Sequence, residues 1–310
     1  MLSRRIIRVK VMQTLYALHS MDEEIKFADG LPILKKNLEQ SRQLFTYLVF
    51  IITEVARFAE SDALQRSNKH LPSSSDLNIN TKIAGNESVW TLLSDESFKK
   101  AMQDYKVQLL VDLQIVKQLY DALAASPEYQ AYTSTQDRDK KSEKKIMEFI
   151  FTGIMLLNEN FVNSLEENFM HWEDDAEMMI TLMTNFFQRM SKFNFGEMLT
   201  PEKWDFAKGL LECVILKNDY CLELIKPKLK NWDAERIAAL DMILMQMGVC
   251  EFLYFETIPP KVTINEYIDL AKDYSTPQSG HFVNGILDNI HKELLSENKI
   301  NKKNFRNSTL

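Results

Sequence analysis

Glycine and proline are scarce in this 310-residue chain, with only 8 of each. Average usage would give about 20 glycines. A nucleotide-binding enzyme with a glycine-rich phosphate loop needs more glycine than this, and so does an all-β barrel with many tight turns. The chain also lacks the motifs GxxxxGK[ST], GxGxxG, HExxH and GxSxG, and its 5 histidines are scattered. We therefore expect no enzyme activity, no metal site and no cofactor.

Cysteines and long apolar runs are few as well. Cys213, Cys221 and Cys250 are odd in number and show no CxxC spacing. This pattern favours buried thiols in a reducing cytosol over a disulfide framework or a zinc site. The longest apolar run, 44–52, is about half a membrane span. The N-terminal apolar run is interrupted by polar residues and has no small-residue cleavage site. We expect a cytoplasmic protein that does not contact a membrane.

Helical periodicity is the strongest positive signal. Hydrophobic residues make up 45% of the chain and charged residues 26%, which are ordinary globular values. Apolar residues recur at spacings of three, four and seven over 38–55, 105–123 and 146–165, and no stretch alternates with period two. We predict an all-α fold. The polar stretches 67–88 and 126–143 predict loops between helices.

The last third of the chain contains clear helix boundaries. Thr200 followed by Pro201 predicts a helix start, and 236–255 is apolar nearly all round, which predicts a helix buried on most sides. Thr263 and Glu266 have the spacing of a capping box that would start the next helix. Further starts and ends are less strongly marked: Ser279 is a candidate N-cap, and the basic tail after Glu297 is expected to be solvated and frayed.

The N-terminal helix is locally basic, although the net charge of the chain is −7. Residues 1–20 include no acidic residue. On a helical wheel, Arg5, Gln13 and Tyr16 fall within an arc of roughly 80°. The roughly opposite arc is aliphatic and consists of Ile7, Val11, Leu15 and Leu18. A helix docked through its aliphatic face would present a guanidinium, an amide and a phenol, a set that suits single-stranded RNA.

Each of these residues also has a purely structural interpretation. Tyr16 fits an ordinary packed aromatic, and basic charges near an N-terminus are often only solvated. Arg8 lies beside the aliphatic arc, where it would pair with a buried carboxylate instead of RNA. These alternatives remain open from the residues alone.

The sequence resembles the NusB family of transcription antitermination factors. RRIIRVKVMQTLYA follows the family's first-helix pattern R-R-x-x-R-x-x-x-x-Q-x-L-Y, and IPPKVTINEYIDLAK and FVNGILD follow long, ordered patterns of its C-terminal part. The resemblance covers 3–20 and about 203–291. It implies a fold of two small packed helical bundles and a protein that is not an enzyme.

The resemblance also implies partners and site residues. NusB proteins pair with the small-subunit ribosomal protein NusE, and the pair binds single-stranded boxA RNA. The RNA polymerase antitermination complex then reads through terminators, especially in ribosomal RNA operons. Matching positions place the following residues in the RNA-facing helix: Arg4, Arg5, Arg8, Gln13 and Tyr16. Phe282 is a second candidate for the RNA surface, although it shares a helix face with Ile286 and could be core. Asp241 occupies an acidic position near the RNA and partner surface, although it could instead satisfy Arg236.

Family members are typically about half this length, and 31–195 aligns with no counterpart. We expect a basic first helix of the NusB-like domain over 1–30, then a helical insertion or extended N-terminal bundle over 31–195. The NusB-like C-terminal part would follow over 196–295, with a flexible basic tail over 296–310. An alternative function is a non-enzymatic interaction scaffold that uses 31–195, and self-association into a homodimer is also open. An RNA methyltransferase is not favoured, because the chain has neither a glycine-rich cofactor loop nor a catalytic Pro-Cys motif.

Overall fold

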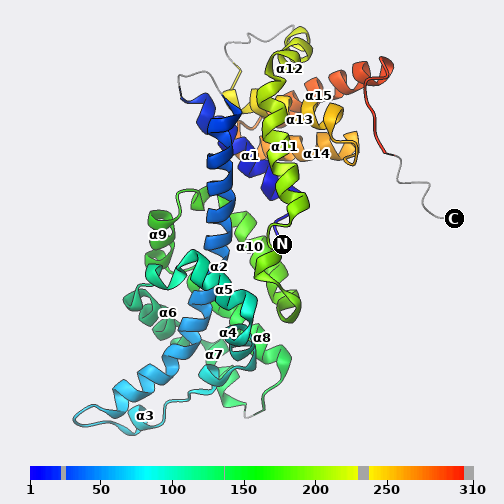
Figure 1. Cartoon of the computed structure of the whole chain (residues 1–310). Helices are drawn as coiled ribbons and strands as arrows, with labels where there is room; N and C mark the ends of the chain where they lie inside the picture. The colour runs from blue at the N-terminus through cyan, green and yellow to red at the C-terminus, as the bar shows by residue number, and fades with distance from the viewer. Residues whose placement is uncertain (22–25, 136, 230–236, 304–310) are drawn as a thin grey trace, which may run out of the picture. The chain divides into compact units, whose positions relative to one another are not determined.

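The computed structural model describes residues 1–21, 26–135, 137–229 and 237–303 (Figure 1). Within these ranges the regular secondary structure is helical and no strand occurs, so the all-α prediction is confirmed. The chain forms two compact units. The central unit is Glu39–Met198; the terminal unit combines Leu2–Leu38 with the chain from Leu199 on. No helix of the described residues is long and apolar enough to cross a bilayer.

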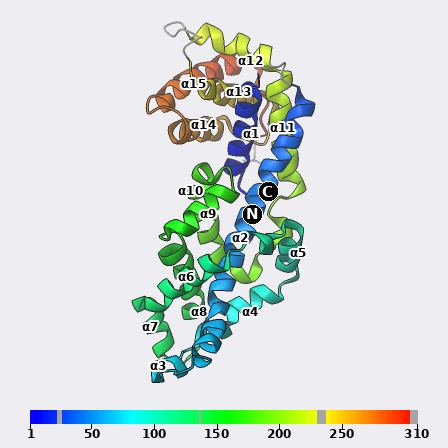
Figure 2. The same cartoon turned by 90° about the vertical axis from the view of Figure 1, so that its left-hand side faces the viewer.

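The terminal unit is organised around α13. Its helices are α1 (Arg4–His19), the start of α2 (Phe27–Ser67), α11 (Pro201–Leu216), α12 (Asn218–Ile225), α13 (Ala239–Tyr254), α14 (Pro260–Tyr274) and α15 (Ser279–Ser296). Helix α13 contacts α1, α11, α12, α14 and α15 (Figure 2). It is buried along most of its length, as the sequence predicted. Gly248 permits the close approach of α15, because a Cβ there would lie 2.8 Å from a methyl of Leu287.

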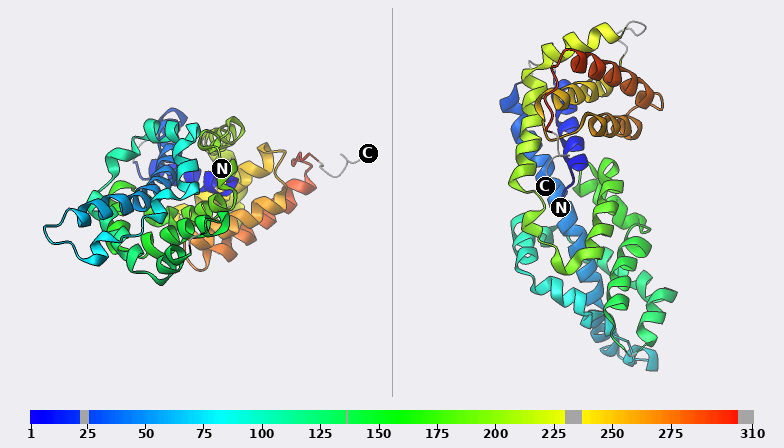
Figure 3. Two further views of the ribbon diagram at one scale, coloured as in Figure 1. Left: turned by 90° about the horizontal axis from the view of Figure 1, so that it is seen from below. Right: turned by 90° about the vertical axis from the view of Figure 1, so that its right-hand side faces the viewer.

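Local signals account for the starts of α1, α11 and α14 in the terminal unit. The Ser3 side chain caps α1 by accepting a hydrogen bond from the Ile6 amide at 3.2 Å. Thr200 is the N-cap of α11 with Pro201 at its first position, as predicted. Pro260 starts α14 three residues before Thr263, so the predicted capping box is wrong. A proline at the first helical position loses no hydrogen bond, which lets α14 begin there. The α13–α15 group is seen again in the right-hand view of Figure 3.

The central unit continues α2 and adds shorter helices. These are α3 (Ser74–Leu77), α4 (Glu87–Ser94), α5 (Glu96–Tyr105), α6 (Leu113–Ala125), α7 (Pro127–Ser134), α8 (Lys140–Phe149), α9 (Glu159–Asn168) and α10 (Trp172–Arg189). A π-helical turn, Ile150–Met155, follows α8. An aromatic cluster lies in the core of this unit: the Phe45 ring lies 5.6 Å from that of Phe186 and 5.2 Å from that of Phe193. The fully buried Phe45 comes from the periodic stretch that predicted α2.

Two expected continuous helices are broken in this unit. Within 105–123, α5 ends at Lys106, whose φ of 51° is left-handed, and α6 begins only after Asp112. Within 146–165, Asn158 caps α9 separately from α8. The periodic pattern continued across both breaks because exposed leucines fell in register with it. The 126–143 loop prediction is wrong for α7, which Ser126 caps ahead of a proline.

The basic tail is anchored up to Lys303. The Lys302 ammonium donates to the backbone carbonyls of Glu251 at 2.7 Å and Phe255 at 2.8 Å, at the C-terminal end of α13. Lys303 forms an ion pair of 3.3 Å with Glu256. A cation at a helix C-terminus satisfies carbonyls that have no partner within the helix. The expectation of a solvated, frayed tail is therefore wrong for Lys302 and Lys303, and 304–310 lie outside the described residues.

Candidate nucleic-acid interface

Helix α1 docks through its aliphatic face. Ile7, Val11, Leu15 and Leu18 are all buried in the terminal unit. Tyr16 is 49% exposed, and the side chains of Arg4 and Arg5 are 41% and 40% exposed. The orientation predicted from the helical wheel is confirmed. We call Arg4, Arg5, Gln13 and Tyr16 the polar face of α1.

Two arginines of the polar face form exposed ion pairs with neighbouring helices. Arg4 binds Glu202 of α11 at 2.9 Å, and Arg5 binds Asp273 of α14 at 2.7 Å. Each pair is surrounded by solvent, so it contributes only about 0–1 kcal/mol. A phosphate group can therefore replace either carboxylate at little cost.

Gln13 is held by a lysine of its own helix. The Lys10 ammonium donates to Gln13 Oε1 at 3.0 Å, although Lys10 is only 1% exposed. This contact fixes the amide orientation one turn from Tyr16. Lys10 is one of the basic residues of the N-terminal stretch, and the helical wheel alone gave it no role. Its position three residues before Gln13 was the available signal.

Arg8 lies inside the terminal unit, and its side chain is 3% exposed. Its Nε and Nη2 donate to the two carboxylate oxygens of Glu251 at 2.7 and 3.1 Å, and its Nη1 donates to Glu266 at 3.1 Å. Glu251 also accepts from the Thr263 hydroxyl at 3.0 Å and the Tyr267 hydroxyl at 2.8 Å. We call these five residues the Glu251 network. It removes Arg8 from the RNA-facing set, because both sides of the guanidinium are occupied by protein.

The charges in the Glu251 network are fixed by mutual contact. Burial lowers the pKa of Arg8, but the hydrogen bond and negative charge of Glu251 outweigh it and hold that pKa above its usual value. Burial, with the charge of Glu251, raises the pKa of Tyr267 well above its ordinary value. The guanidinium therefore stays charged and the phenol neutral at physiological pH. Glu251 is a charged residue within the mostly apolar stretch 236–255, and this was the sequence signal for a buried partner.

The two remaining candidates are less accessible than the polar face of α1. Phe282 is partly buried on α15, whereas Ile286, one turn further along, is buried. Asp241 is 6% exposed and accepts a hydrogen bond of 2.8 Å from Ser279, the first residue of α15. Arg236, the alternative partner considered for Asp241, lies outside the described residues. Asp241 therefore joins the starts of α13 and α15.

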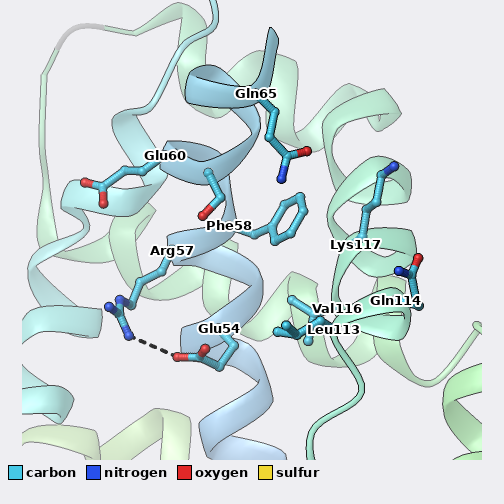
Figure 4. A pocket seen from close by; sticks show the side chains of 10 residues that line it. Glu54, Arg57, Phe58, Glu60, Gln65, Leu113, Gln114, Val116 and Lys117 are labelled. Carbon is cyan, nitrogen blue, oxygen red and sulfur yellow. Dashed lines mark hydrogen bonds and ion pairs between the residues drawn. The ribbon is translucent and has the colours of Figure 1, made fainter. Parts of the chain in front are cut away.

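A groove of about 480 Å³ lies between α2 and α6 in the central unit (Figure 4). In Figure 4, Phe58 projects from α2 toward α6 and Arg57 pairs with Glu54. The ten side chains drawn there include no histidine or cysteine. Among the residues that the structure describes, no group of three potential ligands could hold a metal ion. The groove combines charged side chains with the apolar side chains of Phe58, Leu113 and Val116, and so offers a mixed surface for contact.

Comparison with known proteins gives consistent matches to one family. Residues 156–292 match the model of the NusB family, and the match begins within the 31–195 segment. The chain is 42% identical over 102 residues to the transcription antitermination protein NusB of Salinibacter ruber, covering 33% of this chain and 64% of that protein. The chain thus spans under two thirds of that relative.

Two further relatives are covered more fully. The NusB protein of Finegoldia magna is 38% identical over 105 residues, with 34% of this chain and 77% of that protein covered. That of Thermodesulfovibrio yellowstonii is 32% identical over 160 residues, with 52% of this chain and 95% of that protein covered. The solved T. maritima NusB structure is 30% identical, covers 35% of this chain and 82% of that chain, and has a TM-score of 0.30.

Proposed function

The chain belongs to the NusB family, and from this membership we propose that it is a non-enzymatic transcription antitermination factor of the cytoplasm. It binds boxA-type single-stranded RNA together with a NusE-type small-subunit ribosomal protein. Within the RNA polymerase antitermination complex, this assembly supports read-through in ribosomal RNA operons. The observation that carries the proposal is the polar face of α1, which is exposed, basic and aromatic at the positions that match the family's first-helix pattern.

The contacts on α1 suggest a role for each residue. Arg4 and Arg5 exchange their exposed carboxylate partners for RNA phosphates. Tyr16 stacks on a base, and the amide of Gln13, oriented by Lys10, contacts a base edge. Phe282, in the first turn of α15, and Asp241, in the first turn of α13, are the secondary members of the proposed site and border the RNA or partner surface.

Fluorescence anisotropy of a labelled boxA-like RNA tests the proposal. The full chain is titrated with and without its NusE-type partner at about 50 and about 200 mM salt. We expect tighter binding with the partner present. The affinity should fall with salt by a slope of about −0.7 for each neutralised phosphate. Salt-sensitive binding that strengthens with the partner supports the proposal, whereas no RNA binding by the folded protein in either mixture overturns it.

Variants of the polar face locate the site. We expect Arg5→Ala to weaken binding and to reduce the salt slope by about 0.7. Tyr16→Ala should cost roughly 1–3 kcal/mol of binding free energy, the usual contribution of one stacked base. Matched controls are Arg57→Ala, an exposed arginine paired with Glu54 in the central unit, and Tyr254→Ala, an exposed tyrosine of α13. Equal losses in the variants and their controls would remove α1 from the site.

A second candidate function is the interaction scaffold based on 31–195. The groove between α2 and α6 favours it, because Leu113 at its rim is 66% exposed. Exposed apolar side chains beside a groove are a common feature of protein-binding surfaces. This function would be supported if Leu113→Glu abolished capture of the NusE-type partner while RNA binding by the isolated chain stayed unchanged.

A further inference from the structure

All three cysteines of the chain lie in one part of the terminal unit, although they are spread over 38 positions of the sequence, from 213 to 250. They come from three consecutive helices: Cys213 from α11, Cys221 from α12 and Cys250 from α13. The sulfurs of Cys221 and Cys250 are 3.7 Å apart and both residues are fully buried. Cys213 is partly exposed, and all three thiols are free. The expectation of buried thiols is thus confirmed for two of the three.

The three thiols are chemically unequal. The hydrogen bond with Cys250 lowers the pKa of Cys221. Hydrogen bonds with Cys213 and Cys221, together with burial, raise the pKa of Cys250 well above its usual value. Cys250 therefore interacts with both other thiols, and its sulfur lies within hydrogen-bonding distance of the Cys221 sulfur. Disulfide exchange needs this pairing, in which one sulfur has thiolate character next to a second sulfur that it can attack.

We propose that Cys213, Cys221 and Cys250 form a reversible thiol-oxidation site that reacts with hydrogen peroxide and ends in a disulfide between Cys221 and Cys250. The sulfurs of Cys221 and Cys250 face each other at 3.7 Å, a contact that the packing of two small apolar side chains does not require. The exposure of Cys213 provides an entry point that the two buried sulfurs lack. The contact between Cys221 and Cys250 provides a stable product, because a shift of about 1.7 Å brings their sulfurs to bonding distance.

The reaction proceeds in three steps that balance. The Cys213 thiolate attacks one peroxide oxygen, so that an S–O bond forms, the O–O bond breaks and one water leaves after protonation. The Cys250 sulfur attacks the resulting sulfenic acid, which forms an S–S bond and releases a second water. The Cys221 thiolate then attacks the Cys250 sulfur, so that the disulfide moves to Cys221 and Cys250 and the Cys213 thiol is restored. Overall, two thiols lose two electrons and hydrogen peroxide is reduced to two waters.

Mass spectrometry of the full chain tests the proposal. The reduced protein is treated with hydrogen peroxide, its remaining thiols are alkylated, and its peptides are analysed without reduction. We expect one disulfide, between the Cys221 and Cys250 peptides, one alkylated cysteine at Cys213, and full reversal by dithiothreitol. Three alkylated thiols in a sample whose exposed methionines have been oxidised would overturn the proposal. Disulfides found only between two chains would overturn it as well.

Single variants separate the three roles. Cys221→Ser should stop the reaction at a Cys213–Cys250 disulfide, and Cys250→Ser should leave a sulfenic acid at Cys213 that dimedone traps. Cys213→Ser should slow formation of the final disulfide at least tenfold, because oxidant must then reach a buried sulfur. Circular dichroism of each variant checks that the helices are retained, and Cys250→Ala serves as a second variant should the buried serine disturb folding. An unchanged rate in Cys213→Ser would show that Cys213 is not the entry point.

Discussion

Arg4 and Arg8 lie one turn apart on α1 and both bind carboxylates, but they differ in burial. The Arg4–Glu202 pair is exposed at both ends, whereas the Arg8–Glu251 pair is closed to solvent. An exposed pair is replaced by water when it breaks. A buried pair that loses one partner leaves the other charge in a medium that cannot solvate it. The two arginines therefore have different consequences for stability.

We predict that Arg8→Ala lowers the free energy of unfolding by about 3–5 kcal/mol, because Glu251 is left buried without its cation. Arg4→Ala should lower it by no more than about 1 kcal/mol. Urea denaturation followed by circular dichroism measures both values, and Arg4→Ala is the matched control on the same helix. Equal losses in the two variants would contradict the role given to the Glu251 network.

The raised pKa of Tyr267 predicts that the protein becomes less stable at alkaline pH. Its pKa in the folded protein is raised well above the usual 10, so the folded state keeps the phenol protonated while the unfolded state releases the proton. This contribution is fully present below about pH 10 and is lost as pH rises toward the folded pKa. The stability difference between the wild type and Tyr267→Phe should therefore shrink above pH 10 in urea titrations. A constant difference from pH 8 to pH 11 would contradict this.

The contribution of Lys302 to stability changes with pH in the opposite direction, over a neighbouring pH range. Burial lowers the pKa of its ammonium to about 8 from its usual value of 10.5, so the unfolded state binds the proton more tightly. Its contribution to stability therefore rises between about pH 8 and 10.5. Because Tyr267→Phe and the wild type share Lys302, the comparison between them isolates the phenol.

At the scale of the helices, the apolar patterns of the sequence were sufficient to predict α1, α2 and α13, because each of these helices buries a face or most of its surface. The breaks at Lys106 and Asn158 were not predictable from periodicity, since they depend on a left-handed residue and on a capping side chain. The candidate site was likewise predictable only in part. The orientation of the polar face of α1 followed from its wheel, whereas the burial of Arg8 depends on Glu251, which lies 243 positions further along the chain.

The backbone conformation of Lys106 predicts that glycine stabilises the folded protein at this position. It ends α5 with a φ of 51°, which glycine adopts without the steric cost that a side chain carries. Lys106→Gly should raise the free energy of unfolding by about 1 kcal/mol. Lys100→Gly, at an exposed position within α5, should lower it by about 1 kcal/mol. Thermal or urea unfolding compares the two, and a loss of stability in both variants would exclude relief of strain at Lys106.

At the scale of the whole molecule, each unit has its own buried core, and α2 belongs to both. We expected the inserted segment to begin at residue 31, whereas the central unit begins at Glu39, within α2. A continuous helix gives no local mark where one unit ends and the next begins. The boundary becomes visible only from the residues that pack against each part of the helix.

This organisation predicts that damage to one core stays local. Arg8→Ala should lower hydrogen-exchange protection of backbone amides in α11, α13 and α14 of the terminal unit while leaving protection in α6, α8 and α10 of the central unit unchanged. Mass spectrometry of exchange in the native protein measures both sets in one experiment. Uniform loss of protection would show that α2 couples the two units into a single cooperative whole.

The Arg8–Glu251 pair also sets an order of events during synthesis. Glu251, the carboxylate that neutralises Arg8, is made 243 residues after it. At 5–20 residues per second, α1 waits on the order of 10–50 seconds for its partner. The central unit is continuous in sequence and can fold during that interval. Helix α1, still basic and undocked, therefore acquires its final place only after α13 has been made.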